Sequence, residues 1–84
     1  MVTWEMPDGT AFRYFGVAVS DAALREFVLR FMSAEGMSWD VSNWDDTALE
    51  RAFDRRFGEK VRVKRERAPS GVIVIVFQPV LASA

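Results

Sequence analysis

Adjacent carboxylates are the side chains of this sequence that come closest to a catalytic pair. Asp45 and Asp46 are neighbours in the stretch DVSNWDD. Two carboxyl groups can act as general acid and general base when a pocket raises the pKa of one of them. Adjacent acids at the start of a helix more often interact favourably with the helix dipole. We therefore interpret Asp45 and Asp46 as the beginning of a helix.

The sequence contains no histidine and no cysteine. The commonest general base and metal ligand is therefore missing, and so is any thiolate site or disulfide. A serine nucleophile would need Lys60 or Lys64 as its base, and no other feature supports such a site. Oxygen ligands occur along DVSNWDD, which runs from Asp40 to Asp46, but without the glycine and distal glutamate of an EF-hand loop. We expect no catalytic residue, no metal site, no cofactor and no enzymatic activity.

Charge is unevenly distributed along the second half of the chain. Residues 35–50 carry five acids and no base, whereas residues 51–67 carry eight bases and three acids. The simpler interpretation is that these adjoining segments neutralise each other in the fold. The alternative is a basic ribbon that contacts nucleic acid. Its contact residues would be Arg55, Arg56, Arg62, Lys64, Arg65 and Arg67. The net charge of −1 disfavours this alternative, because nucleic-acid-binding domains are usually strongly basic.

Two tryptophans lie in the acidic linker. Exposed tryptophans often anchor protein interfaces, so Trp39 and Trp44 are candidate interface residues. A tryptophan just before a helix can instead pack on the first helical turn as a hydrophobic staple. We favour this second interpretation, with Trp44 against Leu49, and keep both tryptophans as candidates.

Two short stretches predict β-hairpins with the same turn. MPDG at residues 6–9 and APSG at residues 68–71 place proline second and glycine fourth, which is typical of a type I turn followed by a glycine bulge. This turn pairs Met6 with Thr10 and Ala68 with Val72. The alternation of apolar residues agrees with that register. The core faces then carry Val2, Trp4, Phe12 and Tyr14 in the first hairpin, and Val61, Val63, Ile73, Ile75 and Phe77 in the second.

Between the two hairpins, apolar residues recur at helical spacing, which predicts two helices. The first predicted helix covers residues 21–35, with Ser20 as N-cap and Gly36 just beyond its end. The second covers residues 45–57, with Ser42, Asn43 or Asp45 as cap. Gly58 would end it.

The order of elements is therefore β-β-α-α-β-β within a single domain of residues 1–84. We predict an α+β fold, a two-layer sandwich with a mostly antiparallel four-stranded sheet and two helices on one face. Separate sheets for the two hairpins, or a β-grasp-like arrangement, are alternatives. No apolar run reaches the roughly 18 residues of a membrane span, and the N-terminus does not resemble a signal peptide. We expect a cytoplasmic protein that does not enter a membrane.

The last predicted strand is apolar on both sides. Its outer face would carry Val72, Val74 and Val76. The aliphatic stems of Arg62 and Lys64 can cover these valines, the sheet can curl so that the chain end covers them, or another chain can cover them. Phe15 and Val17 join the same face unless Gly16 forms a bulge, which would exchange the faces. Such a patch would be large enough for an interaction site. Our candidate interface is Phe15, Val17, Val72, Val74, Val76, Trp39 and Trp44.

These features favour a small protein that binds other proteins and performs no catalysis. We expect an adaptor or regulator that acts through protein–protein contact and forms a homodimer. A stoichiometric inhibitor, including one of phage origin, is one form of this role. The alternative is a regulator that binds nucleic acid through residues 51–67.

Overall fold

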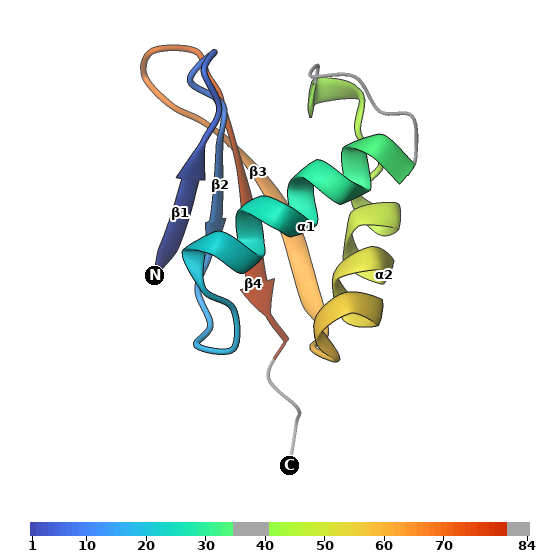
Figure 1. Ribbon diagram of the computed structural model, residues 1–84. Helices are drawn as coiled ribbons and strands as arrows, with labels where there is room; N and C mark the ends of the chain where they lie inside the picture. The colour runs from blue at the N-terminus through green and yellow to red at the C-terminus, as the bar shows by residue number, and fades with distance from the viewer. Residues whose placement is uncertain (35–40, 81–84) are drawn as a thin grey trace.

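The computed structural model describes residues 1–34 and 41–80 (Figure 1). Along the chain, a first hairpin is followed by two helices and then by a second hairpin. The elements are β1 (Val2–Glu5), β2 (Ala11–Tyr14), α1 (Asp21–Ala34), the short 3₁₀ helix η1 (Val41–Asn43), α2 (Asp46–Phe57), β3 (Val61–Arg67) and β4 (Ile73–Pro79). The predicted order β-β-α-α-β-β is confirmed.

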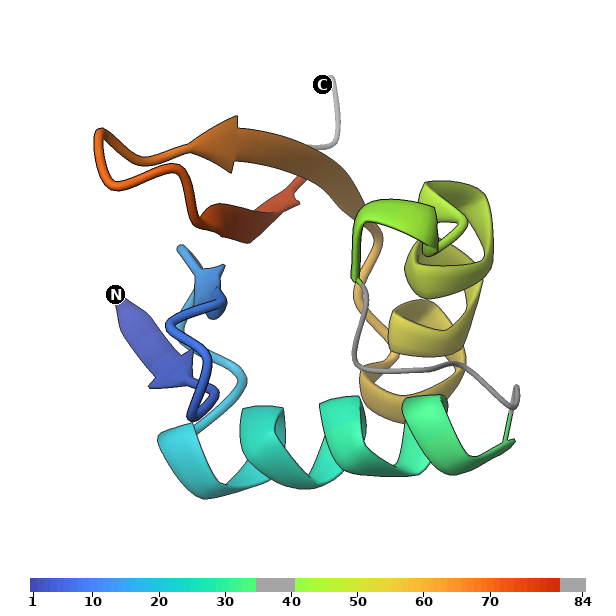
Figure 2. The same ribbon diagram turned by 90° about the horizontal axis from the view of Figure 1, so that it is seen from above.

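The four strands form one sheet in the order β1-β2-β4-β3. Each hairpin is antiparallel, and β2 and β4 meet in parallel at the centre. Both helices cover the same face of the sheet, as the view from above shows (Figure 2). The predicted α+β fold is thus confirmed, and the alternative of two separate sheets is wrong. The sequence left the strand order open, and the parallel central pair is new.

Both hairpin turns have the predicted geometry. In the first, the N–H of Met6 donates to the carbonyl of Thr10 at 2.7 Å. In the second, the N–H of Ala68 donates to the carbonyl of Val72 at 2.9 Å. The glycines that follow the turns, at positions 9 and 71, have φ angles of 94° and 89°. Residues that carry a side chain rarely adopt such φ angles, so glycine is strongly favoured at both positions.

Side-chain oxygens cap the N-termini of both helices. The hydroxyl of Ser20 accepts a hydrogen bond from the N–H of Ala23 at 3.2 Å, as predicted for α1. Asp45 caps α2, because its carboxylate accepts from the N–H of Thr47 at 2.9 Å. The helix therefore begins one residue later than predicted. The predicted stop of α1 at Gly36 lies outside the described residues.

Strand β4 is apolar on both sides because it lies inside the sheet. Val74 and Val76 are only 6% and 4% exposed, and with Ala11 they form a small second cluster on the face without helices. Val76 lies between Arg13 of β2 and Lys64 of β3. Long side chains on both neighbouring strands can cover a central valine in this way. We therefore remove Val74 and Val76 from the candidate interface, because their side chains leave little surface for a partner.

Val72 is half-buried at the tip of the second hairpin. A Cβ atom at position 9 would lie 3.1 Å from Cγ1 of Val72, so this valine rests against the glycine of the first hairpin turn. The two hairpin tips thus contact each other. Val72 also has an intramolecular neighbour and is a weak interface candidate.

Candidate protein interface

Large exposed apolar side chains gather at one end of the sheet. Because β2 and β4 are parallel, both strands finish at this end, and β1 begins there. The N–H of Phe15 donates to the carbonyl of Phe77 at 3.2 Å, and that of Val80 donates to the carbonyl of Lys60 at 3.0 Å. We call this surface the end patch. Its members are Met1, Phe15, Val17 and Val80, which are the exposed large hydrophobic residues of the described chain.

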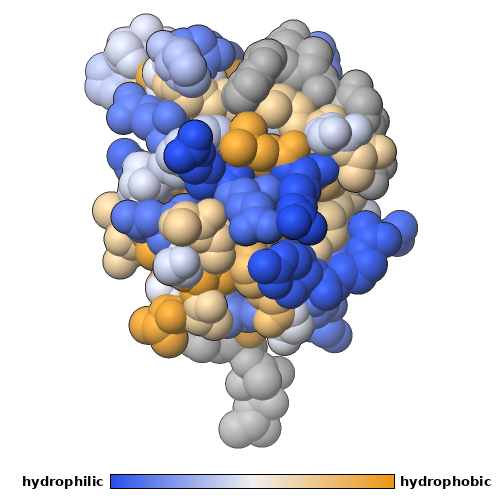
Figure 3. All heavy atoms as spheres, in the orientation of Figure 1, coloured by the Kyte–Doolittle hydropathy of each residue, from blue (hydrophilic) through white to orange (hydrophobic). Residues whose placement is uncertain are grey.

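The loop between β2 and α1 carries the most prominent part of the end patch. Val17 is fully exposed, and Phe15 is 52% exposed. In Figure 3 strongly hydrophobic atoms stand at the surface near this loop, at the lower left. Val19, two residues further on, is buried in the core. The loop therefore enters solvent and returns to the core within a few residues, with both apolar side chains on its outside.

Tyr14 holds this loop against the rest of the molecule. Its ring is completely buried and lies 5.5 Å from the ring of Phe53 in α2. Its hydroxyl donates a hydrogen bond to the carboxylate of Glu59, in the turn after α2. The same hydroxyl accepts from the N–H of Ala18 at 3.4 Å. One side chain thus joins the end of β2, the loop and the turn after α2.

Gly16 is the residue that permits this arrangement. A Cβ atom at position 16 would lie 2.0 Å from the hydroxyl oxygen of Tyr14, far inside contact distance. The chain leaves the sheet after Tyr14, where β2 ends. Glycine is therefore needed at position 16 because the tyrosine hydroxyl approaches the backbone closely. Gly16 lies beyond the end of β2, so it is not a bulge within that strand.

The environment of Tyr14 keeps its hydroxyl protonated. Burial raises the pKa of this hydroxyl above its ordinary value of 10.0, and the hydrogen bond to Glu59 raises it further. Burial disfavours the tyrosinate because it removes water, and the hydrogen bond favours the protonated hydroxyl because only that form can donate to Glu59. The hydroxyl is therefore a donor to Glu59 over the whole neutral range.

Arg65 is partly buried, and contacts within the protein occupy its guanidinium. Its Nε donates to Oδ1 of Asp46 at 2.9 Å, and its Nη2 lies 2.8 Å from the same oxygen in an ion pair. It also donates to the backbone carbonyls of Val41 and Trp44. This cation ties β3 to the chain that leads into α2. Asp46 is thus an ion-pair partner of Arg65 at the beginning of α2.

The other five basic side chains predicted to contact nucleic acid lie on separate surfaces. Arg55 and Arg56 line a groove between the helices. Arg62 and Lys64 alternate with the buried valines of β3 and are exposed on the sheet face without helices. Arg67 donates to the carbonyl of Gly71 at 3.1 Å, at a hairpin tip. The fold does not bring these side chains together into one basic ribbon.

Trp44 lies in the core. Its side chain is 4% exposed, and its ring is 5.7 Å from that of Phe12 and 5.4 Å from that of Phe31. Trp44 directly precedes the cap of α2, and Leu49 in the first turns of that helix is fully buried in the same cluster. This placement fits the staple interpretation and removes Trp44 from the candidate interface. Trp39 lies outside the described residues.

Among residues 1–34 and 41–80, no group of three or more acidic side chains is placed so that it could hold a metal ion. Within the same residues, no helix has the length and apolar character needed to cross a membrane. No protein-family model, no curated protein and no solved structure matches this chain. The end patch is therefore interpreted from its physical properties alone.

Sequence reasoning identified Phe15 and Val17 but not the whole end patch. Val80 is not among the candidates from the sequence, and it directly follows Pro79, the last residue of β4. Its position beside the loop follows from the parallel pairing of β2 and β4, which puts the ends of both strands together. The signal available in the sequence was an apolar residue, Val80, directly after the predicted strand.

Proposed function

We propose that this protein is a non-catalytic binding protein, and that its end patch docks against the end patch of a second copy. The observation that carries the proposal is the gathering of Met1, Phe15, Val17 and Val80 at one end of the sheet. Large apolar side chains that are exposed at the same end of a sheet are candidates for an interaction site. An apolar patch is complementary to itself, and a twofold axis through it gives a closed dimer.

The fixed loop favours tight association. Burying a valine or phenylalanine side chain completely contributes roughly 1.5–3 kcal/mol. Ordering a mobile loop would consume part of that free energy. Here the hydroxyl of Tyr14 already holds the loop, through the N–H of Ala18 and the carboxylate of Glu59. Phe15 and Val17 are thus presented before the partner arrives.

Such a protein would act by binding its target in a fixed ratio. As a dimer the protein would offer two copies of every other surface to a target, as an adaptor, a regulator or an inhibitor does. We place it in the cytoplasm, in keeping with a chain that contains no cysteine.

The absence of cysteine also provides a direct experiment. Val17→Cys introduces a unique thiol at a fully exposed position of the end patch, and Ser33→Cys introduces one at an exposed position of α1. Under mild oxidation of dilute protein, we expect Val17→Cys to form a disulfide-linked dimer much faster than Ser33→Cys. Equal rates for the two variants would contradict docking through the end patch.

A further inference from the structure

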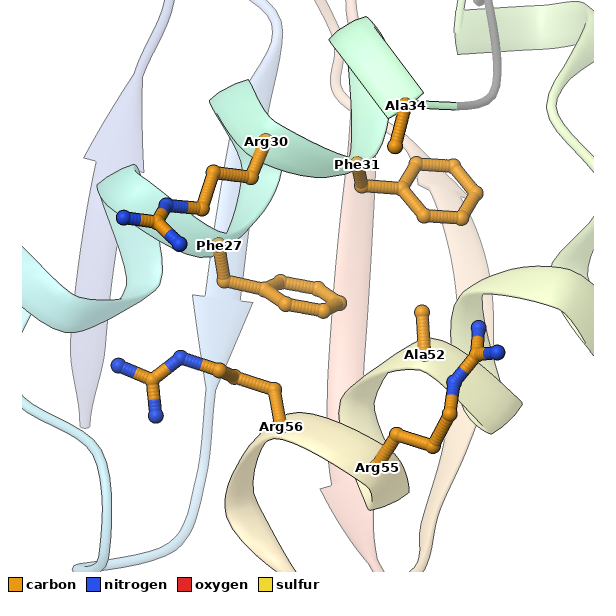
Figure 4. A pocket seen from close by; sticks show the side chains of 7 residues that line it. All are labelled: Phe27, Arg30, Phe31, Ala34, Ala52, Arg55 and Arg56. Carbon is orange, nitrogen blue, oxygen red and sulfur yellow. The ribbon is translucent and has the colours of Figure 1, made fainter.

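A groove lies between α1 and α2, on the side of the helices away from the sheet. Its volume is about 290 Å³. The floor is apolar and consists of Phe27, Phe31, Ala34 and Ala52. Three arginine side chains, Arg30 from α1 and Arg55 and Arg56 from α2, surround the floor (Figure 4). No lining residue among those described is acidic, so the groove combines an apolar floor with a positive rim.

The three arginines differ in the contacts that their guanidinium groups already make within the protein. Arg30 forms an ion pair with Glu26 at 2.9 Å, one turn away on the exposed side of α1. The guanidinium carbon of Arg56 lies 5.0 Å from the centre of the Phe57 ring. Within residues 1–34 and 41–80, Arg55 has no ion pair and no hydrogen bond from its guanidinium. The rim therefore has guanidinium groups that can accept an anionic partner.

We propose that this groove binds an acidic segment of a partner protein, with one bulky apolar side chain on the floor and carboxylates on the rim. Guanidinium groups match carboxylates in shape and bind them through two parallel hydrogen bonds. Opposite charges across an interface accelerate association and select the partner. Peptide segments commonly dock in this way, with apolar anchors in a groove between helices.

The apolar floor and the basic rim of the groove favour a peptide over nucleic acid. The groove, with a volume of about 290 Å³, is at the lower end of the scale of ligand pockets, roughly 300–1,000 Å³. It has room for a side-chain anchor. Single-stranded nucleic acid binds by stacking bases on exposed aromatic faces. Phe27 and Phe31 are only 5% and 4% exposed, so they present little ring surface for stacking.

This inference names a second partner surface for the proposed binding protein and shares no residue with the end patch. The two proposals therefore fail separately. Variants of the end patch test the dimer, and variants of the groove test the acidic segment.

The test begins with selection from a random peptide library on the immobilised wild-type protein. We expect enrichment of peptides that contain several Asp or Glu residues around one bulky apolar residue. A labelled peptide of the enriched class is then measured by fluorescence anisotropy. Exchange of its acids for Asn or Gln, or of its apolar residue for Ala, should weaken binding by about tenfold or more. A labelled oligothymidine serves as the nucleic-acid probe and should not bind.

Matched variants locate the binding site. Arg55→Glu reverses one charge at the groove, and Arg62→Glu makes the same change on the sheet face without helices. We expect Arg55→Glu to weaken the peptide by about tenfold and Arg62→Glu to have little effect. Ala34→Leu fills part of the floor from an exposed position and should weaken binding without removing a charge. Circular dichroism checks that each variant is folded.

Three results would overturn the proposal. The first is a library selection that enriches no acidic class of peptide. The second is an enriched peptide that binds Arg55→Glu and Arg62→Glu equally well. The third is tight binding of oligothymidine that Arg55→Glu abolishes, which would assign the groove to nucleic acid.

Discussion

The hydroxyl of Tyr14 donates a hydrogen bond to the carboxylate of Glu59, which joins the end of β2 to the turn after α2. The two residues are 45 positions apart in the sequence. The same hydroxyl accepts from the N–H of Ala18. The apolar loop that carries Phe15 and Val17 is therefore held by a contact between the two halves of the chain.

The titration of Tyr14 tests this contact. Tyr14 is the single tyrosine of the chain, so the ultraviolet absorbance of tyrosinate reports on it alone. We expect it to ionise above its ordinary pKa of 10.0, first because it is buried and second because it is bonded to Glu59. Glu59→Gln removes the negative charge and should lower the pKa, but not to the ordinary value, since burial persists. Ionisation of the folded wild type at the ordinary pKa would contradict the contact.

The raised pKa also predicts the pH dependence of stability. Between the pKa of the unfolded chain and that of the folded protein, the folded state binds more protons. The contribution of Tyr14 to stability is therefore complete below pH 10 and is lost as the pH rises through the folded pKa. Urea unfolding below and above pH 10 measures this loss. Tyr14→Phe, which cannot ionise, should lose less stability over the same interval.

Gly16→Ala should destabilise the protein because the new methyl group would overlap the Tyr14 hydroxyl. We expect a loss of about 1–3 kcal/mol in the free energy of unfolding, typical of overpacking. In a Tyr14→Leu background the side chain no longer reaches position 16, so the same change should cost less. Equal costs in the two backgrounds, measured by urea unfolding, would show that Tyr14 and Gly16 do not interact.

Arg65→Met should cost about 2–4 kcal/mol, because it removes the ion pair with Asp46 and the hydrogen bonds that the guanidinium donates to the carbonyls of Val41 and Trp44. Asp46→Asn should cost less, about 1 kcal/mol, because those carbonyl bonds persist and the ion pair is partly exposed. Arg62→Met is the matched control on the exposed face and should change stability by less than about 0.5 kcal/mol. A cost for Arg62→Met equal to that of Arg65→Met would contradict the structural role of Arg65.

Truncation should affect monomer stability at Val76 but not at Val17. Val76 is buried between neighbouring strands, so Val76→Ala should lower the stability of the monomer by about 1–3 kcal/mol. Val17 is fully exposed, so Val17→Ala should leave the stability of the monomer unchanged and weaken only association. Chemical unfolding of dilute protein separates the two effects. A stability loss for Val17→Ala as large as that for Val76→Ala would argue against the exposed loop.

Local signals in the sequence were sufficient for the hairpins and the helices. Proline and glycine at fixed places in MPDG and APSG specify the turns, and the turns specify which side chains share a face. In the structure Arg65 lies opposite Ile75, on the core face, where a cation needs partners. Those partners, Asp46 and two carbonyls, could be identified only from the structure.

Contacts between distant segments were beyond the reach of the sequence. The parallel pairing of β2 with β4 depends on how the chain returns after two helices, and no local signal encodes it. That pairing buries Val74 and Val76 and brings Val80 to the end at which Phe15 leaves the sheet. The candidate interface therefore moved from the face of the sheet to its end.

Sedimentation equilibrium of the wild type and of Val17→Asp tests the central claim most directly. If the end patch joins two copies, the wild type should pass from monomer to dimer as its concentration rises. Val17→Asp should remain a monomer over the same range with an unchanged circular dichroism spectrum, because it places a charge in the contact but not in the core. A wild type that stays monomeric at every concentration, or a Val17→Asp dimer as tight as the wild type, would contradict the claim.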